Sequence, residues 1–118
     1  EGMERLQYII DEAKKVDPLG NEHKTDENKI RGCISNLWVG GEVLADGTME
    51  YYHDADSHMT KGTAKVILDM VNGEPKEEVA GLTIDSFKPL GIRELLTMQR
   101  QVGFAGLIER VVQIAKNK

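Results

Sequence analysis

The chain contains one cysteine, Cys33, which follows Arg31 and Gly32. A thiol acts as a nucleophile when it is accessible and when nearby positive charge stabilises the thiolate. Arg31 offers such a charge two residues away, and Gly32 allows the backbone to turn sharply before the cysteine. The alternative is that Cys33 is a small buried hydrophobe that fills a gap beneath its loop. A lone cysteine excludes an intramolecular disulfide, and the residues alone leave both readings open.

Two histidines, His53 and His58, could be combined with Cys33 into a cysteine–histidine hydrolase. Such a site also needs an orienting group, an oxyanion hole and a substrate cleft. A chain of 118 residues has little room for all of them. We therefore expect His58 to be exposed at the start of a helix, and His23 to be exposed in a polar loop.

The aspartates Asp54, Asp56 and Asp69 are candidate metal ligands. Asp54-x-Asp56 is similar to the start of a calcium loop, but the later ligands and the required glycine do not follow. The three histidines have no zinc-site spacing. We predict no metal site and no cofactor, and we interpret Asp56 as a helix cap, with Ser57 as the alternative cap.

The aromatic residues Trp38, Tyr51 and Tyr52 could form a platform on which nucleic-acid bases stack. The formal net charge is −5, however, and basic residues do not alternate with the aromatics. We therefore predict packing roles for them and no nucleic-acid binding. The apolar runs carry charges and are too short to span a membrane, and no apolar signal segment opens the sequence. We expect a cytoplasmic protein.

The elements that must position these residues follow from periodicity. Apolar residues at intervals of three and four predict a helix over 6–16, ended by Pro18 and Gly20. Asp46-Gly47 between two β-prone runs, 37–44 and 49–54, predicts a hairpin. Residues 29–32 are expected to add a third strand, which would place Cys33 in the connection between strands.

Helices account for the rest of the chain. One is predicted from Asp56 or Ser57 to a stop at Gly73, a short one over 76–80 after Pro75, and another short piece over 87–96. A long amphipathic helix ends the chain, with apolar positions from Phe104 to Ala115. The predicted fold class is α+β: a single domain over 1–118, with a small three-stranded antiparallel sheet flanked by helices and a long C-terminal amphipathic helix.

The segment Gly32-Cys33-x-Ser35-x-x-Trp38 resembles the acceptor loop of the SufE/CsdE family of sulfur acceptors. Three other segments resemble the family in the same order and at similar separations: Tyr8-Ile9-Ile10, Asp54-Ala55-Asp56-Ser57 followed by Lys61-Gly62, and Arg100-x-x-Gly103. The chain departs from the family at Gln99, where a serine is common, and at Ile34, where a polar residue is usual. The sequence contains little of the family's N-terminal extension, and whether such an extension was removed is left open by the sequence.

The resemblance implies that Cys33 takes persulfide sulfur from a SufS-type cysteine desulfurase, stimulates that enzyme, and passes the sulfur to iron–sulfur cluster assembly on a scaffold such as SufBCD. On the same resemblance, the pyridoxal phosphate would belong to the desulfurase, and this chain would be a persulfide transfer partner rather than a stand-alone enzyme. Arg31, Gly32, Ser35, Trp38 and Gly103 would shape the loop and recognise the partner.

Arg100 would stabilise the thiolate and the persulfide, and the alternative is a surface residue paired with Glu94 or Glu109. We also expect the Cys33 side chain to be covered in the free protein. A second function remains open, a regulatory module that binds a desulfurase without carrying sulfur. The identity of the desulfurase, the destination of the sulfur and homodimer formation are left open by the sequence.

Overall fold

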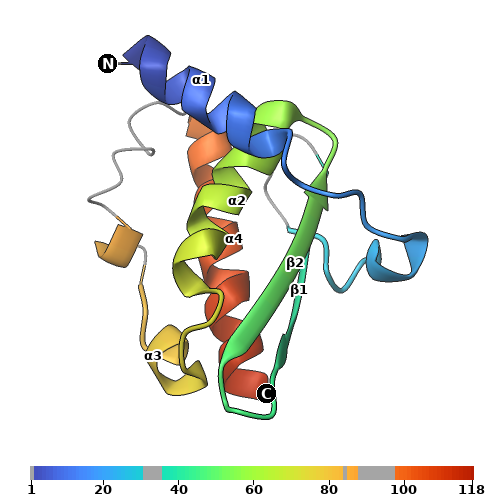
Figure 1. The fold of residues 1–118 in the computed structure, drawn as a ribbon, viewed down its shortest axis with the longest axis vertical. Helices are drawn as coiled ribbons and strands as arrows, with labels where there is room; N and C mark the ends of the chain where they lie inside the picture. Colours follow the sequence, from blue (N-terminus) through green and yellow to red (C-terminus); the bar gives the residue numbers. More distant parts are fainter. Residues whose placement is uncertain (1, 31–35, 84, 88–97) are drawn as a thin grey trace.

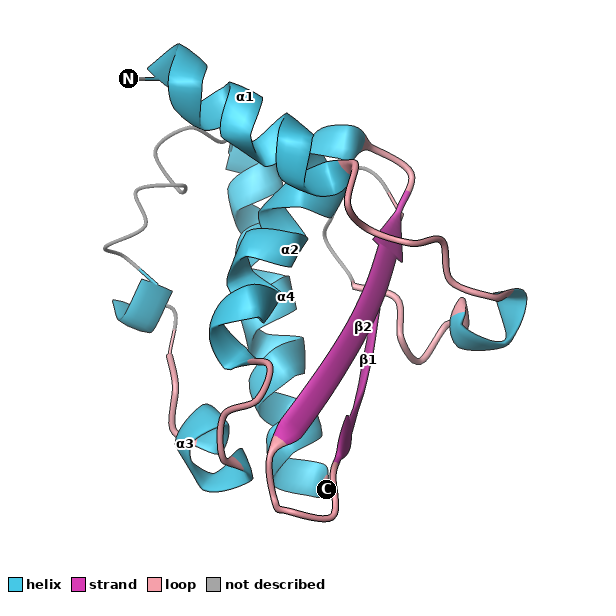
Figure 2. Cartoon of the chain, in the orientation of Figure 1, coloured by secondary structure: helices cyan, strands magenta, loops and turns pink. Residues whose placement is uncertain are grey.

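The computed structural model describes residues 2–30, 36–83, 85–87 and 98–118, and for residues 2, 3, 5, 6 and 98–103 it describes the backbone alone. Helices pack beside one antiparallel hairpin (Figures 1 and 2), which confirms the α+β class. The elements are α1 (Gly2–Ala13), the short 3₁₀ turn η1 (Asn21–His23), β1 (Leu37–Val43), β2 (Met49–Ala55), α2 (His58–Val71), α3 (Lys76–Ala80) and α4 (Met98–Asn117).

The hairpin has the predicted turn. Strands β1 and β2 pair from Leu37 opposite Ala55 to Val43 opposite Met49. Gly47 has a φ of 88°, which favours glycine. The Asp46 carboxylate accepts hydrogen bonds from the Thr48 amide at 3.0 Å and from the Thr48 hydroxyl at 2.6 Å. The local Asp-Gly signal therefore determines where the chain reverses.

A third strand is not among the strands of the described part of the chain. Lys29 makes an isolated antiparallel bridge with Trp38. The Ile30 amide donates to the Leu37 carbonyl oxygen at 2.8 Å, and the Val39 amide donates to that of Asn28 at 2.8 Å. These bonds keep the segment before Cys33 beside β1, although the predicted strand over 29–32 is not confirmed and residues 31 and 32 lie outside the described residues.

The core lies between the hairpin and the helices. Helix α2 packs on β2, α4 packs on β1, and α1 crosses α2 (Figure 1). Among the described residues, the fully buried large side chains come from both strands and from each of the α-helices α1 to α4: Ile9, Val39, Met49, Ile67, Leu68, Val71, Val79, Leu107 and Val111. Burial of this apolar set is the main driving force for the fold.

The helix boundaries follow local signals, except at the end of α1. The Ser57 hydroxyl accepts the Thr60 amide at 3.4 Å, so Ser57 rather than Asp56 caps α2. Gly73, with a φ of 84°, follows the end of α2, and Pro75 precedes α3 as predicted. The first helix was predicted to reach residue 16, which was wrong, because it ends at Ala13.

After Ala13 the backbone forms turns with hydrogen bonds that span three residues in place of four. The amides of Lys15 and Val16 donate three residues back, to Glu12 and Ala13. Pro18, which has no amide hydrogen, follows soon after. Val16 is still half-buried, so its apolar character reflects packing rather than helical geometry.

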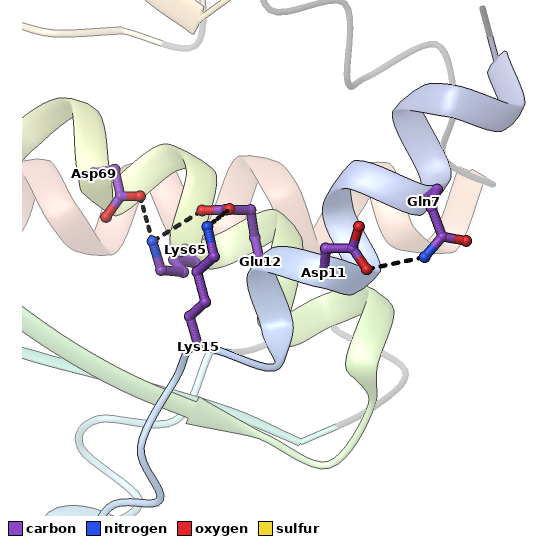
Figure 3. Close-up of polar contacts among 6 residues, drawn as sticks. All are labelled: Gln7, Asp11, Glu12, Lys15, Lys65 and Asp69. Atoms are coloured by element: carbon purple, nitrogen blue, oxygen red, sulfur yellow. Dashed lines mark hydrogen bonds and ion pairs between the residues drawn. The ribbon is translucent and has the colours of Figure 1, made fainter.

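A charged network joins α1 to α2. The Lys65 ammonium lies 2.9 Å from Glu12 Oε1 and 2.6 Å from Asp69 Oδ2, and Lys15 lies 2.6 Å from Glu12 Oε2 (Figure 3). Hydrogen bonds from Lys15 and Lys65 lower the pKa of Glu12.

The predicted piece over 87–96 lies almost entirely outside the described residues. Among the described helices, none is long and apolar enough to cross a membrane.

Candidate functional site

Four of the predicted site residues, Arg31, Gly32, Cys33 and Ser35, lie outside the described residues, and so does the predicted covering of the Cys33 side chain. Trp38 is half-buried in β1. Arg100 and Gly103 belong to α4, where the structure describes only their backbone. The described part of the site therefore consists of the residues that surround the connection over 31–35.

The connection leaves and rejoins the fold at neighbouring positions. On the entry side, the Ile30 amide donates a hydrogen bond to the Leu37 carbonyl oxygen, which joins the residue before the connection to the start of β1. The Asn28 side chain accepts from Arg110 Nη2 at 2.8 Å, while Arg110 Nε donates to the Val39 carbonyl oxygen at 3.3 Å. Helix α4 thus holds both the entry segment and β1.

The exit side is tied to the start of α2. Asn36 Nδ2 donates to Asp56 Oδ2 at 2.6 Å, and the Asp56 amide donates to the Asn36 carbonyl oxygen at 3.1 Å. Asp56 was predicted to be a helix cap, with Ser57 as the alternative. The pairing with Asn36 instead ties Asp56 to the end of the connection. The connection is therefore fixed at both ends by described contacts.

Asp54 is the most heavily hydrogen-bonded carboxylate at this end of the hairpin. It is 4% exposed. Its oxygens accept from the amides of Leu19 at 3.1 Å and Ala55 at 2.8 Å. They also face the ammonium groups of Lys61 at 3.1 Å and Lys24 at 3.3 Å.

Burial by itself would raise the pKa of Asp54, but these hydrogen bonds lower it to about 2. The carboxylate is therefore ionised and paired at neutral pH. Among the described residues, no group of three histidine, cysteine, aspartate or glutamate side chains could hold a metal ion. Asp54 serves as a cation-paired anchor in this structure.

Trp38 lies directly opposite Asp54 in the hairpin. The Lys24 ammonium lies 5.3 Å from the centroid of the Trp38 ring, within the range of a cation–π interaction. One lysine thus contacts both the aromatic residue of the acceptor motif and the buried aspartate. Lys24 is 30 residues from Asp54 in sequence, so no local pattern could have identified this contact.

His23 was expected to be exposed in a polar loop, which is only partly correct. His23, Lys24 and Asn28 are half-buried. The His23 ring lies 4.6 Å from that of Tyr52, centroid to centroid. Asn28 Nδ2 donates to the His23 carbonyl oxygen at 2.9 Å. Tyr52 can lie across β1 because Gly40 opposite it has no side chain.

The two histidines proposed for a hydrolase lie in different environments. His53 is buried, and its Nε2 donates to the Lys61 carbonyl oxygen at 3.1 Å. Burial lowers the pKa of His53. His58 is exposed at the start of α2, as predicted. His53 is therefore held by the backbone of α2, and its ring packs as part of the interior.

The first turns of α4, which carry Arg100 and Gly103, lie at the end of the molecule away from the hairpin turn (Figure 1). Leu37 and Ala55 mark the same end of the hairpin. The start of α4, the start of α2 and both ends of the connection over 31–35 therefore lie toward the same end of the molecule.

Comparison with known proteins gives the following matches. The family model described as SufE, Fe-S metabolism associated domain, matches residues 1–115. An uncharacterized SufE-like protein of Rhizobium etli is 31% identical over 117 residues, covering 96% of this chain and 79% of that protein. The sulfur acceptor protein CsdE of Escherichia coli is 27% identical, covering 96% and 78%. The chloroplastic/mitochondrial SufE-like protein 1 of Arabidopsis thaliana is 30% identical, covering 89% of this chain but 28% of that protein.

Proposed function

The chain belongs to the SufE family, and on that premise we propose that it is a sulfur acceptor of iron–sulfur metabolism that receives persulfide sulfur on Cys33. One relative, CsdE of Escherichia coli, is named a sulfur acceptor. The observation that carries the proposal is the family match over 1–115 in a chain whose only thiol is Cys33. The described contacts that fix both ends of the connection over 31–35 add support.

The chemistry needs only a thiolate and a persulfide donor. Thiolate attack on the terminal sulfur of a donor persulfide forms a bond from that sulfur to Cys33 Sγ and breaks the donor's sulfur–sulfur bond. The donor cysteine leaves as a thiolate, so electrons balance without an external oxidant or reductant. The rate depends on how much of the Cys33 thiol is ionised and how accessible it is.

We further propose a SufS-type cysteine desulfurase as donor, stimulation of that enzyme when the acceptor removes its sulfur, and a scaffold of the SufBCD kind as receiver. Arg100 is assigned to stabilise the thiolate and the persulfide, because a guanidinium is always charged. The start of α4 lies toward the same end of the molecule as both ends of the connection, which supports that assignment.

Intact mass spectrometry tests the proposal. The chain is incubated with a SufS-type desulfurase and free cysteine, and its mass is measured before and after reduction. A gain of one sulfur atom that reduction removes, absent from Cys33→Ser, is expected. An unchanged mass together with faster desulfurase turnover would instead identify a regulatory module that carries no sulfur.

A further inference from the structure

Residues 19–28, here called the strap, loop out beside the hairpin near its open end, on the side away from α2 and α4, and lead through residues 29 and 30 into the connection that contains Cys33 (Figure 1). The strap contacts the hairpin at several points. Its backbone donates from Leu19 to Asp54, His23 packs on Tyr52, and Lys24 lies between Asp54 and Trp38. Five residues beyond Lys24, Lys29 bridges to Trp38. The position of the strap therefore affects the direction in which the chain enters the connection over 31–35.

Lys24 of the strap forms an ion pair with Asp54 of the hairpin. Its side chain is 30% exposed, whereas that of Asp54 is 6% exposed. Lys61 faces the same carboxylate from α2. A single buried carboxylate thus holds two cations that come from different elements. Loss of Lys24 would leave Asp54 paired with Lys61 and two backbone amides, so the carboxylate would remain satisfied.

The rest of the strap has separate anchors. Asn28 is held by Arg110, by the Val39 amide and by the His23 carbonyl oxygen. These contacts do not involve Lys24. Removing the Lys24 charge should therefore loosen the middle of the strap over Trp38 without unfolding the chain.

We propose that Lys24 is a positioning residue for sulfur transfer: through Asp54 and Trp38 it holds the strap on the hairpin and so orients the chain that enters the Cys33 connection. The inference rests on the proposed function, because it assigns a step in that transfer to a contact outside the acceptor motif. Lys24 touches neither sulfur nor donor in this account. It acts through Trp38 and the strap.

The test uses three variants. Lys24→Met keeps the length of the side chain and removes its charge, and Lys24→Arg restores a cation. Lys65→Met is the matched control, because Lys65 also pairs with a buried carboxylate, Glu12, but joins α1 to α2 and contacts no residue of the strap through its ion pairs. Each variant is assayed for its initial rate of sulfur uptake from a SufS-type desulfurase, over a series of acceptor concentrations.

Trp38 is the only tryptophan, so its fluorescence reports on the Lys24 contact directly. Lys24→Met should change the emission and increase quenching by acrylamide, while Lys24→Arg and Lys65→Met should resemble the parent. The maximal rate of sulfur uptake should fall about tenfold or more in Lys24→Met, because small misplacements of reacting groups have large effects on rate. Lys24→Arg should recover most of that rate.

Either of two rate measurements would overturn the inference alone. One is a parent-like rate of uptake in Lys24→Met despite its altered fluorescence, and the other is an equal loss in Lys65→Met. Unaltered fluorescence of Lys24→Met would show that the contact with Trp38 is not made, and would refute it as well. A parent chain that gains no sulfur would refute the proposed function, and this inference with it.

Discussion

A methyl group added at Gly62 should push α1 away from α2. Gly62 lies in α2 where that helix crosses α1, and a Cβ built there would overlap the Ile9 carbonyl oxygen of α1. It would also lie 2.8 Å from Ile9 Cγ2. The obstacle is backbone rather than the tip of a flexible side chain, so Gly62→Ala requires the helices to separate by roughly 1 Å.

The magnitude follows from two opposed effects. Overpacking a tight contact costs about 1–3 kcal/mol, and replacing glycine by alanine inside a helix gains about 1 kcal/mol. Because backbone must move, the cost should lie near the upper end of its range. Gly62→Ala should therefore lower the free energy of unfolding by about 1–2 kcal/mol. For a chain of this length, that loss corresponds to a melting temperature lower by about 4–8 °C.

Urea unfolding followed by far-ultraviolet circular dichroism measures the loss. Gly81→Ala is the control, because its new methyl would lie 3.7 Å from the nearest atom, the Glu78 carbonyl oxygen, and Gly81 has a φ of −93° that alanine adopts. Its effect should stay within about 0.5 kcal/mol. The reasoning is refuted if Gly62→Ala is as stable as the parent, or if both variants lose the same stability.

Three further predictions concern other contacts. Asp54 has a pKa of about 2, below its ordinary 3.8. The ionised Asp54 carboxylate therefore adds to the free energy of unfolding above pH 4, and this stabilisation is lost as pH falls from about 4 to 2. After solvent screening it amounts to about 1–2 kcal/mol. The stability difference between the parent and Asp54→Asn should therefore shrink over that pH range, and a constant difference would contradict the pairing. Arg100→Ala should slow sulfur transfer with little change in melting temperature, whereas normal transfer with a large loss of stability would make Arg100 structural. Tyr51→Phe removes the 2.7 Å hydrogen bond to the buried Val111 carbonyl oxygen and should cost about 1 kcal/mol in urea unfolding; an unchanged midpoint would argue against that bond.

The parts of the fold that sequence predicted correctly depend on local chemistry. Asp46-Gly47 predicted the hairpin turn, Gly73 the end of α2, and Pro75 the start of α3. In each case a few adjacent residues determine the backbone geometry. The end of α1 was wrong by one turn because Val16 continues the apolar spacing after the helical hydrogen bonds have stopped.

The parts that sequence missed depend on contacts between distant segments. Nothing near Lys24 indicates a partner 30 residues away, and nothing near Gly62 indicates that α1 backbone lies against it. For the candidate site, the family motif identified Trp38, whereas Asp54 was named only as a candidate metal ligand and as part of a segment that resembles the family. Its role in gathering two lysines needed the three-dimensional structure.

The central claim, that Cys33 carries the sulfur, is tested most directly on the tryptic peptide of residues 32–61, which holds the only cysteine. After incubation with a SufS-type desulfurase and free cysteine, the chain is alkylated, digested and sequenced by tandem mass spectrometry. We expect an alkylated persulfide on Cys33, and no added sulfur on the same peptide of Cys33→Ser. Added sulfur that persists in Cys33→Ser, or a Cys33 that stays a simple thiol while the desulfurase turns over faster, would contradict it.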